Sequence, residues 1–167
     1  MRLFFAIWPP AVAAHALCLW AESATRATGG RRTPEGNIHL TLAFLGKADA
    51  DRAIRAGKRV QGKAHHLPIE QARYVRANRM VWVAPRETPP ALSALHESLA
   101  MELYREEFIL ERRPFAAHVT LIRDAQRAEL PGLPEVVWPV GEFVLMSSSL
   151  SSRGSTYQPL ERFTLQP

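Results

Sequence analysis

One order of segments occurs twice in this chain. Each half opens with an apolar strand, continues with a Pro-Pro pair, a helix and a basic loop, and ends in a second apolar strand that begins His-x-Thr. The step from Pro10 to His39 is 29 positions, and the step from Pro90 to His118 is 28 positions. Because proline loses no hydrogen bond in the first turn of a helix, each Pro-Pro pair marks a helix start. The halves share little other identity, so we predict a duplicated α+β architecture of two lobes related by an approximate two-fold axis.

The expected elements follow from hydrophobic periodicity and from turn residues. Helix 11–25 ends at Gly29-Gly30, and the strongest helix opens at Pro89-Pro90 with leucines spaced along one face. The other expected segments are strands 3–8 and 37–45, helix 50–64, strands 68–75, 80–84 and 117–123, a proline-rich connector 131–139, and strands 142–150 and 157–165. We expect residues 1–167 to form a single domain made of the two lobes.

The two His-x-Thr motifs place chemically useful groups on one face of a strand. The sequence reads His-Leu-Thr-Leu from His39 and His-Val-Thr-Leu from His118. Since alternate side chains of a strand point to opposite faces, each histidine shares a face with the threonine two residues later, Thr41 or Thr120. In a duplicated fold the two motif strands meet near the axis, so we expect both imidazoles to face one cleft. Two imidazoles with a hydroxyl beside each are suited to acid–base chemistry on a phosphate ester.

Composition limits the class of protein. The chain of 167 residues is 47% hydrophobic, which is enough for a sizeable core. Lys and Arg number 21 against 16 Asp and Glu, and this net charge of +5 suits an anionic partner, although charge alone is weak evidence for nucleic acid. Cys18 is the single cysteine, so no disulfide forms within the chain and we expect a reducing, cytoplasmic setting. The apolar run 3–8 stops at Pro9-Pro10, and no run approaches the ~18 apolar residues of a membrane span.

The paired motifs and their flanks resemble the two-histidine (2H) phosphoesterase superfamily. Within it, the chain is most similar to the bacterial and archaeal RNA 2′,3′-cyclic phosphodiesterases, also called 2′-5′ RNA ligases. The resemblance spans nearly the whole chain and rests on the opening Arg2–Ile7, the first motif region Asn37–Gly46, the second motif region Arg113–Arg123, and Gly154, Tyr157 and Leu160. It implies a bilobal α+β fold with an antiparallel sheet in each lobe, helices outside and a central cleft.

The resemblance also implies roles for five residues. His39 would donate a proton to the departing 3′ oxygen, and His118 would accept one from water. Thr41 and Thr120 would hold the phosphate oxygens, and Arg123 would help to bind the phosphate. The implied reaction opens a 2′,3′-cyclic phosphate at an RNA end to a 2′-phosphate, and its reverse would join a 5′-hydroxyl in a 2′-5′ linkage.

The roles of several residues near the motifs stay open at this stage. Arg123 does not share a face with His118 in a regular strand, so the strand must end or bulge for the arginine to reach the cleft. Phe44 has the same offset in the first motif; it could stack on a base, but core packing is favoured. Tyr157 suits base contact and packing equally. The arginines that precede the motifs suit an RNA track or a solvated loop: Arg31, Arg32, Arg112 and Arg113.

Two alternative functions compete with this prediction. One keeps the chemistry but acts on small cyclic nucleotides or on ADP-ribose cyclic phosphate. The other is an RNA- or nucleotide-binding module without turnover, which would not need two titrating groups. Neither motif has a carboxylate or second histidine at ligand spacing, so we expect no metal and no cofactor. We expect a monomer whose partner is RNA with a cyclic-phosphate end or a small cyclic nucleotide, with no membrane contact.

Overall fold

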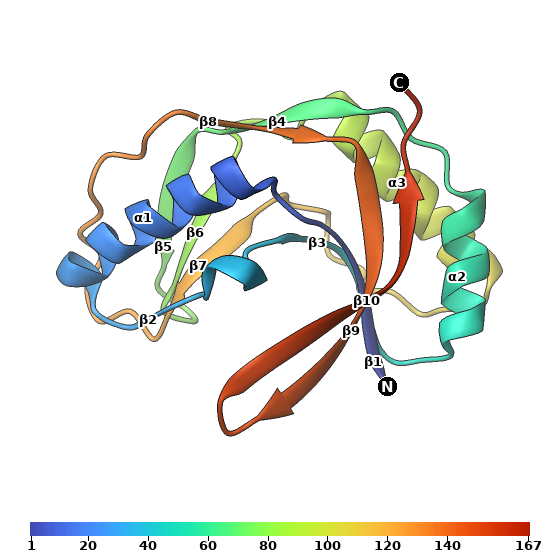
Figure 1. Cartoon of the computed structure of the whole chain (residues 1–167), viewed down its shortest axis with the longest axis horizontal. Helices are drawn as coiled ribbons and strands as arrows, with labels where there is room; N and C mark the ends of the chain where they lie inside the picture. The colour runs from blue at the N-terminus through green and yellow to red at the C-terminus, as the bar shows by residue number, and fades with distance from the viewer.

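The structure is a computed structural model that describes all 167 residues (Figure 1). Its helices are α1 (Ala11–Thr28), α2 (Ala50–Arg59), α3 (Pro90–Arg105) and the short 3₁₀ helix η1 (Glu35–Asn37). Its strands are β1 (Arg2–Ile7), β2 (Arg31–Arg32), β3 (Leu40–Lys47), β4 (His65–Ile69), β5 (Gln71–Val75), β6 (Met80–Ala84), β7 (Val119–Arg123), β8 (Val136–Val140), β9 (Glu142–Ser151) and β10 (Gly154–Thr164). None of the helices has the length and apolar character that crossing a membrane requires.

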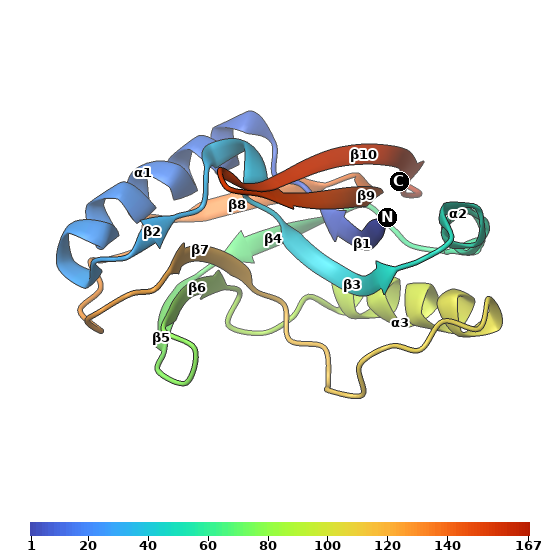
Figure 2. The same ribbon diagram turned by 90° about the horizontal axis from the view of Figure 1, so that it is seen from below.

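The strands form three antiparallel sheets. One has the order β10-β9-β1-β3, the second has the order β2-β7-β6-β5, and β4 pairs with β8. Each motif strand pairs with the strand that opens its own half, β3 with β1 and β7 with β6. Figure 2 shows β3 and β7 on the same side of the molecule, with η1 beside the β9–β10 hairpin. The predicted α+β class with antiparallel sheets is confirmed.

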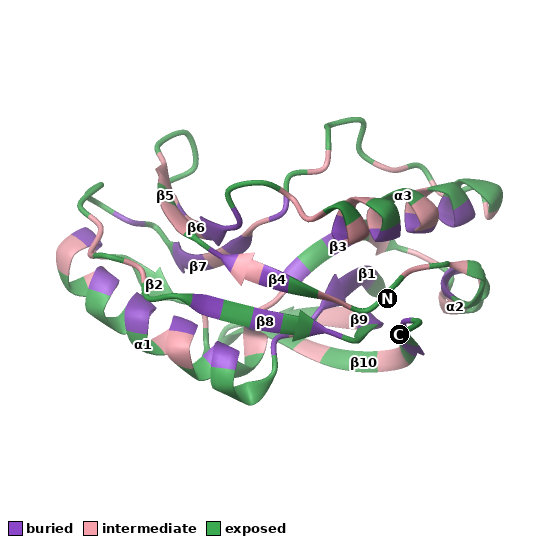
Figure 3. Ribbon diagram, turned by 90° about the horizontal axis from the view of Figure 1, so that it is seen from above, coloured by how far each residue is buried: buried purple, intermediate pink, exposed green.

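The helices cover the outer sides of the sheets with their apolar faces turned inward (Figure 3). Helix α3 buries four leucines at the spacing of one helical face, Leu92, Leu95, Leu99 and Leu103. Helix α1 contacts β2, β7 and β8, whereas α3 contacts α2, β3 and β4. The buried side chains of these elements, apart from the exposed β2, join in a core cluster of 34 residues, and a second cluster of 4 lies between β1 and β9. This core packs against one face of each motif strand, and the histidines and threonines of the motifs are not part of it.

Several predicted segment boundaries are wrong. The strand expected over 68–75 is two strands that break at Glu70 and enter different sheets. The connector 131–139 contains β8, whose residues alternate between buried and exposed; Pro139 is tolerated because a two-stranded sheet leaves one edge of each strand unpaired. Helix α2 stops at Arg59 rather than at 64. Beyond it, Gly62 lies so close to Leu95 and Leu165 that a methyl group there would be 3.0 Å from each.

Candidate active site

Both motif strands contain a β-bulge at the same position. On β3 the partners of Ala6 and Phe5 are Thr41 and Ala43, so one extra residue follows the threonine. On β7 the partners of Trp82 and Val81 are Thr120 and Ile122, which again leaves one extra residue after the threonine. An extra residue reverses the facing of every later side chain in the strand.

The burial pattern follows the bulges. Leu121 and Ile122 are consecutive and both are fully buried, and Arg123 is exposed. Arg123 therefore lies on the same face as Thr120, as a regular strand would not allow. In the first motif the equivalent residue is Phe44, which is 51% exposed, so the favoured prediction of core packing for Phe44 is wrong.

The two histidines directly precede their strands and are held in the same way. His39 Nδ1 lies 2.7 Å from the carbonyl oxygen of Asn37, and His118 Nδ1 lies 2.8 Å from the carbonyl oxygen of Ala116. A carbonyl only accepts, so each Nδ1 carries the proton and donates it. The Nε2 atom of each ring is then the one left for a reaction. His39 Nε2 lies 3.2 Å from Thr41 Oγ1, so the ring nitrogen and the hydroxyl of the first motif are within hydrogen-bond distance of each other.

Each histidine also stacks on a tryptophan that no sequence pattern had indicated. The rings of Trp8 and His39 have centroids 4.6 Å apart and planes 12° apart, and those of Trp82 and His118 have centroids 4.1 Å apart and planes 23° apart. Trp8 directly follows β1 and Trp82 lies on β6, so each indole comes from the strand that pairs with the motif strand. The edge of Tyr157 meets His39 at 5.3 Å between centroids, which places this tyrosine in the site.

Burial lowers the pKa of His39 below its ordinary value. The hydrogen bond to Asn37 opposes this effect, and the positive charges of Arg123 and His118 lower the pKa further. Those two residues therefore lie close enough to His39 to act on its charge, although 79 positions separate the histidines. Charges of this kind also attract an anion into the space between them.

The loop before the first motif ties the two motif strands together. Thr33 donates its backbone N–H to the carbonyl oxygen of Leu121 at 2.8 Å and its hydroxyl to that of Thr120 at 3.0 Å. Strand β2 adds a pairing between Arg31 and Arg123. Part of the predicted basic loop is thus an edge strand, and it holds β7 in place beside the first motif.

The arginines near the motifs are engaged to different degrees. Arg31 donates to Asp124 Oδ2 from Nε at 2.9 Å and from Nη2 at 2.7 Å, and this interaction lowers the pKa of Asp124. Arg113 pairs with Glu111 at 3.0 Å. Arg123 has no carboxylate partner within ion-pair distance; its Nη1 lies 4.0 Å from Met80 Sδ. Arg32 lies 3.9 Å from Glu22, and Arg112, like Arg123, has no ion-pair partner. Of these arginines, Arg123 is the one that shares a strand face with Thr120.

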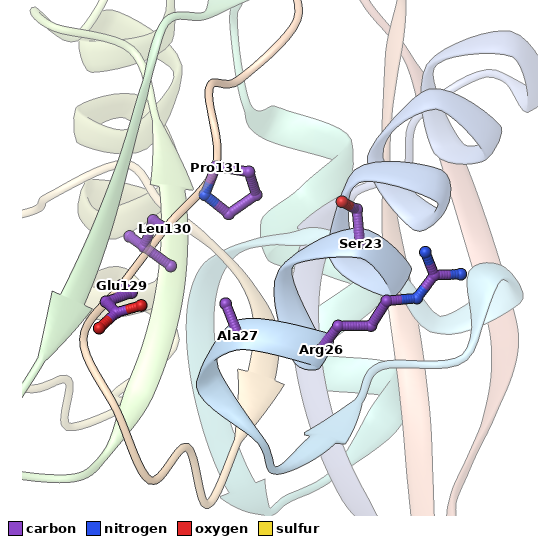
Figure 4. Close-up of a pocket in the computed structure, with 6 residues that line it drawn as sticks. All are labelled: Ser23, Arg26, Ala27, Glu129, Leu130 and Pro131. Atoms are coloured by element: carbon purple, nitrogen blue, oxygen red, sulfur yellow. The ribbon is translucent and has the colours of Figure 1, made fainter.

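A separate cavity of about 510 Å³ lies between the end of α1 and the segment that follows β7 (Figure 4). Its walls include Ser23, Arg26 and Glu129, and none of its residues belongs to either motif. No group of three His, Cys, Asp or Glu side chains is arranged to hold a metal ion.

Comparison with known proteins shows the family of the chain. The model of the family described as LigT like Phosphoesterase matches residues 7–82. The RNA 2′,3′-cyclic phosphodiesterase of Escherichia coli is 34% identical over 170 residues, which cover 98% of this chain and 96% of that protein. The chain belongs to the LigT-like phosphoesterase family.

A second curated relative agrees in sequence, and a solved structure agrees in fold. The RNA 2′,3′-cyclic phosphodiesterase of Thermus thermophilus is 31% identical over 192 residues, 99% of this chain and 91% of that protein. A crystal structure of E. coli LigT complexed with 3′-AMP has a TM-score of 0.87 at 32% identity and covers 99% of this chain and 98% of that one. The expected membership of the 2H superfamily is confirmed.

Proposed function

We propose that this protein hydrolyses the 2′,3′-cyclic phosphate at the end of an RNA chain to a 2′-phosphate. The observation that carries the proposal is the matched setting of His39 and His118. Each ring donates Nδ1–H to a backbone carbonyl, stacks on an indole and leaves Nε2 for the reaction. The substrate follows from the relatives, which are named for this activity and align over almost the whole chain.

The reaction needs two proton transfers on opposite sides of the phosphorus. His118 Nε2 takes a proton from water, whose oxygen forms a new bond to phosphorus. The bond from phosphorus to the 3′ oxygen breaks, and His39 Nε2 gives its proton to that oxygen. His118 then releases its proton to solvent and His39 takes up a proton from solvent, which restores the starting state. If a 5′-hydroxyl took the place of the water, its oxygen would bond to the phosphorus as the bond to the 3′ oxygen breaks, and the product would be a 2′-5′ linkage.

The remaining site residues stabilise charge on the phosphate. The hydroxyls of Thr41 and Thr120 donate to the non-bridging oxygens, where negative charge increases in the transition state. Arg123 binds the same oxygens through two parallel N–H groups, an arrangement that its exposure and the β7 bulge permit. All five groups belong to one chain, so one copy supplies the whole site. The proposal is therefore a single domain of two lobes that acts as a monomer. We further propose the cytoplasm as its compartment.

The test is turnover of a short RNA that ends in a 2′,3′-cyclic phosphate, with a chelator present. We expect a product that ends in 2′-phosphate and no 3′-phosphate. A 3′-phosphate product would overturn the proposed roles of the two histidines. Absence of any product from the purified, folded protein would overturn the proposed activity.

A further inference from the structure

A small cavity of about 220 Å³ lies beside two aromatic side chains that contact His39. Its floor is Val144 and Met146 on β9, and two aromatic side chains, Trp8 and Tyr157, stand at its sides. This volume is below the roughly 300–1,000 Å³ of sites for drug-sized ligands, and it suits one flat ring system. Aromatic rings around an apolar floor are the surroundings in which proteins stack unpaired bases.

The cavity shares its walls with the environment of His39. Trp8 and Tyr157 both contact the imidazole, and Asn37, whose carbonyl oxygen accepts the Nδ1 proton, is a third wall residue. None of the residues proposed to act on the phosphate lines the cavity, neither the two histidines nor Thr41, Thr120 and Arg123. The cavity therefore adjoins the place proposed for the phosphate without being part of it.

Polar groups stand at the cavity wall where a nucleotide would need them. The Asn37 side chain donates Nδ2–H to the carbonyl oxygen of Ser155 at 3.2 Å, so its amide oxygen is left to accept from a ligand. Arg162 also lines the cavity; its side chain is 62% exposed, and its ion pair with Glu142 is long, at 3.5 Å. This guanidinium retains N–H groups for a phosphodiester outside the cavity.

We propose that this cavity is a second nucleobase subsite, which holds the base of the nucleotide next to the cyclic-phosphate end. The inference rests on the proposed function. The base of the reacting nucleotide is carried by the same ribose as the phosphate and stays beside the phosphorus. A base in this cavity, which none of the proposed phosphate-site residues lines, belongs to a neighbouring nucleotide. Because the cyclic phosphate ends the chain, the only neighbour is the one on the 5′ side.

The test compares two substrates that differ in one base. One is a dinucleotide that ends in a 2′,3′-cyclic phosphate, and the other is the same compound without the upstream base. We expect the protein to favour the complete dinucleotide by about tenfold or more in kcat/KM, since loss of one stacked base has effects of this size. The ratio reports the subsite, because both substrates undergo the same chemistry at the same phosphate.

Two variants remove the cavity in different ways. Met146→Trp fills it and Tyr157→Leu removes an aromatic wall, and both should bring the ratio close to one. The matched control is Met101→Trp, a change at an exposed methionine on α3, and it should leave the ratio and the rate as they are. Circular dichroism and thermal unfolding check that each variant is folded. A ratio near one in the unmodified protein, or an unchanged ratio in both folded variants, would overturn the subsite.

Calorimetric binding separates this inference from the proposed reaction. The probes are the dinucleoside monophosphate ApA and its analogue without the upstream base, neither of which can be hydrolysed at a cyclic phosphate. Tighter binding of ApA that Tyr157→Leu abolishes supports the subsite even if the protein turns over no cyclic phosphate. Equal binding of the two probes contradicts the subsite even if turnover is normal.

Discussion

The indole of Trp8 lies almost parallel to the imidazole of His39, with 4.6 Å between ring centroids and 12° between planes. One face of the histidine is thereby covered by an apolar surface, and water is kept from it. Burial is the largest cause of the lowered pKa of His39, and Trp8 is one of the side chains that create this burial. Trp8 thus helps to lower the pKa of His39, a residue on which the proposed reaction depends.

The pH dependence of the reaction should reveal this control. His39 must be protonated to act as the acid, so kcat/KM should fall as pH rises through the pKa of His39. Because that pKa is lowered, the fall begins below the ordinary histidine value of about 6.5. Trp8→Ala admits water to the ring, raises this pKa and moves the fall to higher pH. NMR titration of His39 and a pH–rate profile measure the two effects. A His39 pKa that is the same in Trp8→Ala and in the unmodified protein would show that the stacking does not matter.

Removing either histidine should nearly abolish turnover. Each proton transfer by a positioned side chain contributes about 10²- to 10⁴-fold, so we expect His39→Ala and His118→Ala each to lose a factor in this range. His66→Ala is the matched control, since His66 is exposed on β4 and should keep the full rate. The measurement is kcat/KM on an RNA with a cyclic-phosphate end. Normal turnover by either active-site variant would exclude two-histidine catalysis.

The sequence predicted the histidines, the threonines and most of the elements because these depend on local patterns. Helix α3 shows its leucine face directly, and the His-x-Thr motifs are visible in the printed letters. The stacked tryptophans were missed because their position depends on register between strands far apart in the chain. Trp82, for example, meets the second motif only through its pairing with Thr120. No period along the sequence carries that information.

The positions of Arg123 and Phe44 were uncertain for a different reason. The argument from alternation assumes a regular strand, and a bulge cannot be derived from alternation itself. The only available signal was the doubled apolar pair, Leu121 and Ile122, which a regular strand would split between two faces. Strand β8 was missed because the prolines of segment 131–139 indicate a connector, although Val136, Trp138 and Val140 alternate as a half-buried strand does.

Arg123 should need its forked geometry as well as its charge. Arg123→Lys keeps a positive charge but loses the two parallel donors, and the hydrogen bonds of a charged group are each worth about 1.5–3 kcal/mol. We therefore expect kcat/KM to fall by about tenfold or more. Arg26→Lys, the same change at an exposed residue of α1, should have no effect. Equal activity of Arg123→Lys and the unmodified protein would argue that the arginine acts only through its charge.

Gly30 should be required for the position of Arg123. Its φ is +94°, and a methyl group there would lie 2.4 Å from the carbonyl oxygen of Arg123. Gly30→Ala combines an unfavourable backbone conformation with a clash, so we expect a loss of about 1–3 kcal/mol in the free energy of unfolding and a lower kcat/KM. Gly141→Ala, where no atom lies within 4 Å of the added methyl group, is the control. Urea unfolding and steady-state kinetics measure the two losses, and a Gly30→Ala protein with normal stability would contradict the close approach.

The extra residue after each threonine has a consequence for how such chains change over generations. Loss of Leu121 or Ile122 would remove the bulge and restore strict alternation, so the guanidinium of Arg123 would stay on the face of Thr120, one position nearer to it. A spacing of four between histidine and arginine in a regular strand and a spacing of five across a bulge therefore bring the arginine to the same face. Both spacings should occur among descendants of this gene.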